Sequence, residues 1–185
     1  MREGLIESAA RLVRRDGATA LTMRALAAEA GCAVGLPYKL FANREALVSQ
    51  LLDRQFRMVR EAMDAVVAAA GEATVADNLA SFADALLGAE VEVIRLAGDL
   101  HGDLVGAPLE RAATGSGFIV ALASTVPDYV RAEKRAGRID DEVDEETIGF
   151  LVTGALHNLV VSGPGYPRPD AAEIRRHLAH LAALL

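Results

Sequence analysis

The apolar residues recur at helical spacing through nearly the whole chain, and this pattern constrains the fold most. In residues 43–70 an apolar side chain returns every third or fourth position for seven turns; these are Leu47, Val48, Leu51, Leu52, Phe56, Val59, Met63, Val66 and Val67. This spacing lines up one stripe of a helix, whereas a half-buried strand would need strict alternation. The sequence shows no such alternation and no repeat, so it predicts an all-α protein.

Capping residues divide this pattern into separate helices. Thr22, Asn43 and Asp170 are suited to begin a helix, and Gly31 and Gly71 are suited to end one. The predicted helices cover residues 2–15, 22–31, 34–41, 43–70, 75–87, 90–105, 109–136, 145–162 and 170–185. Pro127 lies inside one of them and predicts a kink or a break there, because proline removes an amide donor and clashes with the preceding turn.

Composition narrows the class of protein. The 185 residues include a single cysteine, Cys32, which excludes an internal disulfide and leaves too few thiols for a cysteine-built zinc site. The most apolar run, residues 150–163, is shorter and more polar than the roughly 20 apolar residues that span a bilayer. No signal peptide is evident at the start. We therefore expect a cytoplasmic protein with no membrane segment, cofactor or metal.

The charge is unevenly distributed along the chain. The net charge is −7, but residues 1–60 carry ten basic and six acidic residues, whereas residues 61–185 carry nine and twenty. A basic N-terminal third on an acidic body is typical of a protein that meets phosphates at one end. A solvated helix face containing Arg11, Arg14 and Arg15 is the alternative interpretation of this asymmetry.

Residues 22–31 and 34–41 have the lengths and the glycine-led turn of a helix-turn-helix. The second helix of such a motif enters the major groove of DNA, and the helix starts around it contact phosphates. Gly35 would permit a close approach, Lys39 would reach a phosphate or a guanine edge, and Tyr38 would donate to a phosphate. The predicted DNA-binding residues are Thr22, Arg24, Val34, Gly35, Leu36, Tyr38, Lys39 and Arg44.

The stretch "LTMRALAAEAGCAVGLPYKLFANREALVSQLL" resembles the DNA-binding domain of the TetR (tetracycline repressor) family of bacterial transcriptional regulators. The matching elements are Thr22-x-Arg24, Leu26-Ala27-x-x-Ala30-Gly31, Gly35-x-x-Tyr38-x-x-Phe41 and Arg44-x-x-Leu47. The resemblance covers about residues 4–55. It implies an all-α fold with a three-helix head, a linking fourth helix and a larger body that binds a ligand and dimerises.

Three residues of the second helix depart from the family's pattern. Ala33 stands where the family usually has a capping Ser or Thr, Pro37 stands where Leu or Ile is usual, and Leu40 replaces a frequent polar residue. A lost cap lowers stability by on the order of 1 kcal/mol. These departures leave open a helical small-molecule-binding or interaction protein whose DNA-binding head has degenerated.

Polar residues placed within apolar helices of the body suggest an effector pocket. Buried polar groups need partners, which a ligand or a neighbouring helix can supply. The predicted ligand-binding residues are Phe82, Arg95, Asp99, Phe118, Leu122, Tyr129 and His157, and a role in the core is the alternative for each. The mostly aliphatic and aromatic set predicts a largely apolar small molecule.

The last two helices suit a homodimer. Residues 145–162 are apolar nearly all round, which is more than one monomer can cover, and Gly149 and Gly154 permit close helix approach. With the helix at 170–185 they would form an intersubunit four-helix bundle. The expected organisation is a DNA-binding domain at 1–45 and a ligand-binding and dimerisation domain at 46–185.

The sequence favours a regulator over an enzyme. It contains no Ser/His/Asp set, no paired carboxylates in an apolar setting, no phosphate loop and no metal cluster. A helical enzyme or small-molecule carrier remains a rival interpretation. The prediction is a ligand-responsive repressor that binds a palindromic double-stranded DNA operator as a homodimer and leaves it when a small-molecule effector binds.

Overall fold

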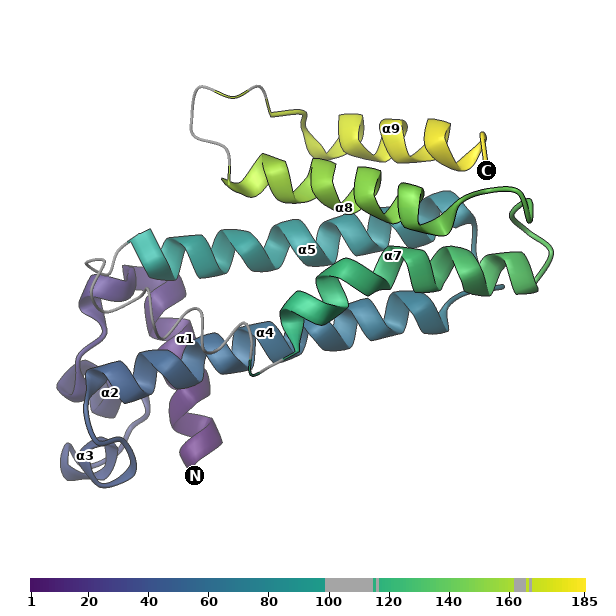
Figure 1. Ribbon diagram of the computed structural model, residues 1–185. Helices are drawn as coiled ribbons and strands as arrows, with labels where there is room; N and C mark the ends of the chain where they lie inside the picture. Colours follow the sequence, from purple (N-terminus) through teal and green to yellow (C-terminus); the bar gives the residue numbers. More distant parts are fainter. Residues whose placement is uncertain (99–114, 116, 162–165, 167) are drawn as a thin grey trace. The chain divides into compact units, whose positions relative to one another are not determined.

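The computed structural model describes residues 1–98, 115, 117–161, 166 and 168–185, with the backbone alone at 89–98 and 160–161. Every regular element within these residues is helical, which confirms the all-α prediction (Figure 1). In chain order they are α1 (Arg2–Asp16), the 3₁₀ turn η1 (Ala18–Ala20), α2 (Met23–Glu29), α3 (Gly35–Leu40), α4 (Arg44–Ala68), α5 (Val75–Gly98), α7 (Phe118–Arg135), α8 (Glu145–Val161) and α9 (Ala171–Ala182). None of the described helices is both long and apolar enough to cross a membrane.

The chain forms two compact units. The N-terminal unit comprises residues 1–57 and 91–116, and the C-terminal unit comprises residues 58–90 and 117–185. The chain passes from the first unit to the second between residues 57 and 58, and this boundary lies within α4. The boundary between residues 90 and 91 lies within α5, so neither of the two is in a loop. The division into domains at residues 45 and 46 stays a prediction.

The core of the N-terminal unit is built from the stripes that the sequence predicts. The predicted apolar residues of α1 are all buried, namely Leu5, Ile6, Ala9, Leu12 and Val13. Phe41 follows α3 and is 1% exposed, and the guanidinium of Arg2 lies 5.3 Å from the centre of its ring. Arg2 Nε also donates to Gln50 Oε1 at 3.1 Å. The first residues of α1 are thereby fixed to the α3–α4 region, as a cation over an aromatic face is attracted to it.

Gly31 makes the turn between α2 and α3. Its φ of 63° lies in the left-handed region, and two backbone bonds close the end of α2: Gly31 N–H donates to Ala28 O at 3.2 Å and Cys32 N–H to Ala27 O at 2.9 Å. This pair of bonds is the Schellman motif, which satisfies the last carbonyls of a helix. The glycine that the sequence places there is required, because a side chain is disfavoured at this backbone conformation.

In the C-terminal unit, α7 passes through Pro127 as one helix, so the predicted break is wrong. The ring of Pro127 packs against α8 at Gly149, where the helix has no side chain. A Cβ placed on Gly149 would lie 2.5 Å from Pro127 Cγ and 2.6 Å from Cδ. Two residues before the proline, the Thr125 hydroxyl donates to Ala121 O at 2.6 Å. Close packing against α8 thus holds a residue that propensity alone would exclude from a helix.

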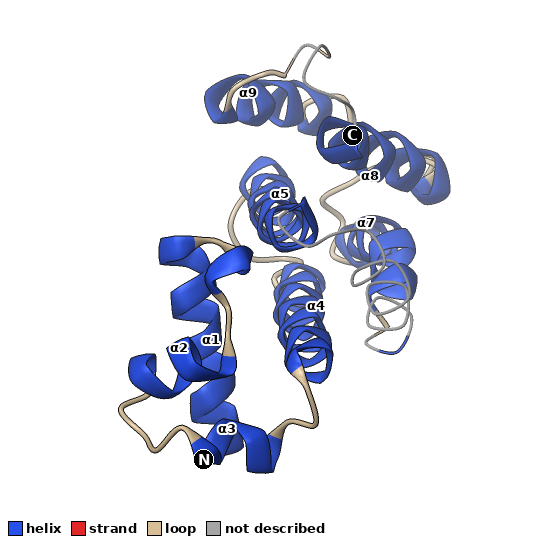
Figure 2. Ribbon diagram, turned by 90° about the vertical axis from the view of Figure 1, so that its left-hand side faces the viewer, coloured by secondary structure: helices blue, strands red, loops and turns tan. Residues whose placement is uncertain are grey.

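The α7–α8 corner is held by charge. Lys134 Nζ donates to Glu145 Oε2 at 2.8 Å, and this hydrogen bond is the main reason why the pKa of Glu145 falls to about 2. The Asp144 carboxylate accepts from Thr147 N–H at 2.6 Å and caps α8. At the start of α9, Asp170 and Glu173 form a reciprocal capping box. Helices α8 and α9 lie side by side and run in opposite directions (Figures 1 and 2).

One further expectation is wrong. The sequence predicts separate helices at residues 75–87 and 90–105, but α5 continues through Gly88 to Gly98; residues 99–105 lie outside the described residues. A glycine inside a helix is unfavourable by only about 1 kcal/mol relative to alanine. Burial of Leu79, Phe82 and Leu86 on the same helix outweighs that amount.

A buried polar network joins the α4–α5 turn to α7. The Tyr129 hydroxyl donates to Glu133 Oε1 at 2.6 Å, and Asn78 Nδ2 donates to the Tyr129 oxygen at 3.1 Å. Glu133 Oε2 accepts from Gly71 N–H at 3.2 Å and pairs with Arg138 Nε at 3.4 Å. Burial, followed by the bond to Glu133, raises the pKa of Tyr129. Because Glu133 has no exposed surface, its charge is compensated entirely by these partners.

Candidate nucleic-acid interface and effector pocket

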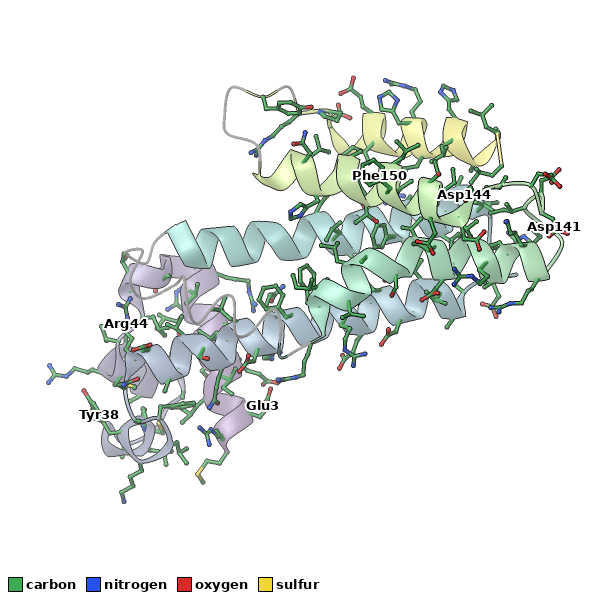
Figure 3. The ribbon with its side chains drawn as sticks, in the orientation of Figure 1. Glu3, Tyr38, Arg44, Asp141, Asp144 and Phe150 are labelled. Carbon is green, nitrogen blue, oxygen red and sulfur yellow. The ribbon has the colours of Figure 1, made fainter. Side chains whose placement is uncertain are left out.

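The outer face of α3 carries four of the predicted DNA-binding residues. Val34 is 47% and Tyr38 62% exposed, and Gly35 and Lys39 are also exposed. Val34 with Tyr38, and Gly35 with Lys39, stand four residues apart and form two adjacent rows on one side of the helix. Tyr38 projects from α3 in Figure 3. Leu36, the fifth predicted residue on this helix, is half-buried.

The residues that depart from the family's pattern leave α3 intact. Pro37 is buried at the third helical position, inside the first turn, where its missing amide is not needed. The carbonyl of Ala33 accepts from Leu36 N–H at 2.9 Å, and that of Pro37 accepts from Phe41 N–H at 2.9 Å. The N-cap of α3 is Val34 and makes no side-chain capping bond, and Leu40 is half-buried.

Other polar residues around α3 build the unit itself. Thr22 Oγ1 accepts from Ala25 N–H at 3.0 Å and caps α2, and Asn43 Oδ1 accepts from Ala46 N–H at 2.8 Å and caps α4. The Arg44 guanidinium donates to Leu21 O and Ala18 O, both at 2.8 Å. Arg44 therefore ties α4 to the segment before α2, and its contact with DNA stays a prediction.

The electrostatic character of this face is positive. Between residues 17 and 44 the sequence has one acidic residue, Glu29, which pairs with Arg15 at 2.8 Å and with Arg11 at 3.4 Å. Arg24 and Lys39 are exposed, and neither has an ion-pair partner among the described residues. Two uncompensated cations flanking a short protruding helix can attract phosphates.

A hollow of about 430 Å³ lies on α7 and α8 and brings together Leu122 and His157, two of the predicted ligand-binding residues. Pro127, Phe150 and Thr153 also line it. The hydroxyl of Thr153 is buried without a hydrogen-bond partner among the described residues. Thr153 was not among the predicted residues, because a sequence does not show whether the hydroxyl of a helical threonine has a hydrogen-bond partner.

The other predicted ligand-binding residues lie elsewhere. Phe82, Phe118 and Tyr129 are buried, and none of them lines this hollow. Tyr129 belongs to the network with Glu133. The side chain of Arg95 and the whole of Asp99 lie outside the described residues. The assignment of these five residues to an effector site stays a prediction.

One side of α8 is left uncovered. Phe150 is 79% and Leu151 53% exposed, and Phe150 projects outward from α8 in Figure 3. A second hollow of about 320 Å³ lies between α8 and α9 and is lined by Leu156, Ile174 and Leu178, among others. Large apolar side chains that stand exposed together on a helix mark a site of interaction.

Comparison with known proteins agrees with this geometry. Residues 5–51 match the family model described as bacterial regulatory proteins, tetR family. No curated protein matches the chain.

Solved structures share the fold over nearly the whole chain. A protein assigned to the TetR family from Mesorhizobium loti MAFF303099 is 20% identical with a TM-score of 0.65, covering 99% of this chain and 93% of its own. The transcriptional regulator FadR from Bacillus subtilis, in complex with stearoyl-CoA, is 17% identical with a TM-score of 0.61, covering 98% and 97%. The ketosteroid transcriptional regulator KstR2 of Mycobacterium tuberculosis is 19% identical with a TM-score of 0.54, covering 98% and 93%. Residues 5–51 therefore form a helix-turn-helix domain that matches the tetR family of bacterial regulatory proteins, and the described remainder of the chain shares the all-helical fold of these regulators.

Proposed function

We propose that this protein is a cytoplasmic repressor that binds a palindromic DNA operator as a homodimer and is released by a small-molecule effector. The observation that carries the proposal is the outer face of α3, where Tyr38 and Lys39 stand exposed behind a well-formed Schellman turn. Arg24 adds a second free cation at the start of α2. A helix presented in this way is the reading element of a helix-turn-helix.

Selection from a random duplex library tests DNA binding. Full-length protein should enrich one palindromic sequence that resists competitor DNA. Lys39→Ala should weaken binding to it and lower the slope of log affinity against log salt by about 1, because one phosphate contact is lost. Arg135→Ala is the matched control, since it removes an exposed cation from α7 in the other unit. Failure to enrich any sequence would overturn the proposal and favour an interaction protein.

The effector site is proposed at the α7–α8 hollow. Its lining is mostly apolar, and the Thr153 hydroxyl, which has no partner within the described part of the chain, offers one hydrogen bond. These features suit a molecule with an apolar body and a single polar group placed near Thr153. The stearoyl-CoA bound to the Bacillus subtilis neighbour makes that compound the first probe to use, with stearic acid beside it.

Leu122→Trp tests this site, since the larger ring fills the hollow. The variant should still bind the selected operator but should no longer be released by a probe that releases the parent protein. Leu184→Trp makes the same change at an 81% exposed leucine outside the hollow and should respond like the parent. Normal release of the Leu122→Trp variant would place the effector elsewhere.

The described residues offer less to a helical enzyme. Among them no group of three or more His, Cys, Asp or Glu residues is placed to hold a metal. The one buried carboxylate network, around Glu133, is fully engaged in structure. Turnover of a substrate by protein that binds no DNA would support the enzyme instead.

A further inference from the structure

We propose that α3 recognises its operator chiefly through the methyl groups of thymine in the major groove, with Val34 and Tyr38 as the residues that determine specificity. This inference rests on the proposed function, because it assumes that α3 meets DNA. It adds a chemical class of base contact that the fold does not imply.

The first step is the chemistry of the exposed face. Val34 and Tyr38 stand one turn apart, and each exposes about half or more of its side chain. Together they present two methyl groups and an aromatic ring. The side-chain hydrogen-bonding groups on this face are the Lys39 ammonium and the Tyr38 hydroxyl alone, and of the two only the ammonium can contact two atoms of one base.

Second, the side chains that most often hydrogen-bond to bases are scarce on α3. Bidentate recognition in the major groove uses Arg or Lys on guanine and Asn or Gln on adenine. Of these types, residues 33–42 contain Lys39 alone. The nearest candidates, Asn43 and Arg44, are engaged in capping α4 and in holding the carbonyls of Ala18 and Leu21. Lys39 is therefore the one side chain of α3 that can make a bidentate hydrogen bond to a base, and it can do so only to guanine.

The third step matches the face to its target. In the major groove thymine alone carries a methyl group, and apolar side chains contact it. Gly35 lies between Val34 and Tyr38, and a Cβ built on it would meet nothing within 4 Å. This open position lets the helix backbone come close enough for short side chains to touch base edges. Lys39 remains available for a phosphate or a guanine.

The charge of the surroundings favours DNA over an apolar protein partner. The only carboxylate between residues 17 and 44, on Glu29, is paired with Arg11 and Arg15. Arg24 and Lys39 are exposed and have no ion-pair partner in the part of the chain that the structure describes. An apolar strip bordered by free cations fits a methyl-bearing groove between two phosphate chains.

Replacing thymine by deoxyuridine in the selected operator tests the inference, because uracil lacks only the methyl group. Fluorescence anisotropy at fixed salt should show about fourfold weaker binding for each contacted methyl that is removed, as expected for burial of one such group. A second pair of operators carries cytosine in place of a contacted thymine, with or without a methyl group at C5. The 5-methylcytosine operator should bind more tightly than the cytosine operator, because it restores the methyl group. The ratio of thymine to uracil affinities should stay constant as salt rises, while both affinities fall.

Val34→Ala assigns the contact. It should bind the thymine operator more weakly and should lose the thymine–uracil difference at one position in each half-site. Val120→Ala is the matched control, since it removes the same methyl groups from a 72% exposed valine on α7. Retention of the fold is checked by thermal unfolding.

The outcomes separate the two proposals. Enrichment of an operator that binds equally well with thymine and with uracil would overturn the methyl readout and leave the repressor function standing. A thymine–uracil difference that persists unchanged in Val34→Ala and Tyr38→Ala would overturn the roles of these two residues. Failure to enrich any DNA would overturn the proposed function, and this inference with it.

Discussion

Glu133 shows how much of the C-terminal unit depends on one carboxylate. It accepts from Tyr129 and Gly71, pairs with Arg138 and has no exposed surface. Glu133→Ala should lower the free energy of unfolding by about 3–5 kcal/mol, because it leaves a cation and two donors without their partner. Tyr129→Phe, which removes one hydrogen bond, should lower it by about 1 kcal/mol. Denaturant unfolding measures both, and equal losses would contradict the central role of Glu133.

The same network predicts a dependence on alkaline pH. Burial raises the pKa of Tyr129 in the folded protein, whereas the unfolded chain ionises it near the usual value of about 10. The stabilisation is therefore complete below pH 10 and is lost as the pH rises from there toward the folded pKa. Thermal unfolding should show a steeper decline above pH 10 in the parent than in Tyr129→Phe. Parallel declines would show that Tyr129 ionises freely.

Gly35 is expected to affect DNA binding but not the stability of the fold. Nothing in the structure requires glycine there, because its φ is not positive and an added Cβ has open space. Gly35→Ala should leave the melting temperature unchanged or slightly raised, since alanine favours the helix. The same variant should weaken operator binding at least tenfold if the backbone must approach a base. Unaltered affinity would show that α3 stays farther from the groove.

At the scale of elements, the contact of α7 with α8 depends on two complementary residues. Gly149→Ala should lower the free energy of unfolding by about 1–3 kcal/mol, because its Cβ would overlap the ring of Pro127. Pro127→Ala in the same chain should recover most of that loss by removing the ring. A double-mutant cycle measures the coupling, and additive effects would contradict direct contact.

Local signals predicted most of the element boundaries. Thr22, Asn43 and Asp170 cap helices as the sequence indicates, and Gly31 adopts the left-handed conformation expected after α2. These signals could be recognised because a cap satisfies its own helix within three residues. The register of the α1 and α4 stripes follows from the same local regularity.

The misses depend on partners far away in sequence. Pro127 remains helical because Gly149, 22 residues later, leaves room for its ring. The bonds of Arg44 to the carbonyls of Ala18 and Leu21, more than 20 residues earlier, have no local signal either, and its contact with DNA stays a prediction. At the candidate sites, the outer face of α3 was predictable from helical spacing. The hollow was predictable only in part, because the packing of α7 on α8 decides that Thr153 lines it.

For the whole molecule, the exposed side of α8 predicts the oligomeric state. Phe150 and Leu151 would be buried in a two-fold bundle of α8 and α9 from two copies. Phe150→Glu should convert a dimer into a monomer in sedimentation-velocity experiments, because a charge cannot be buried there without a partner. Met58→Glu, at a 48% exposed residue of α4, is the control and should stay dimeric. A monomeric parent protein would contradict the bundle.

The sequence contains two lysines, one in each compact unit, and their surroundings differ. Lys39 is exposed on α3, whereas the side chain of Lys134 is 14% exposed and is hydrogen-bonded to Glu145. An acylating reagent should therefore label Lys39 and the amino terminus quickly and Lys134 slowly. Peptide mass spectrometry of one labelled sample can then report the accessibility of a lysine in each unit, without any substitution in the chain. Operator DNA would protect the first lysine, and Glu145→Gln, which weakens the charged partner of Lys134, would speed labelling of the second.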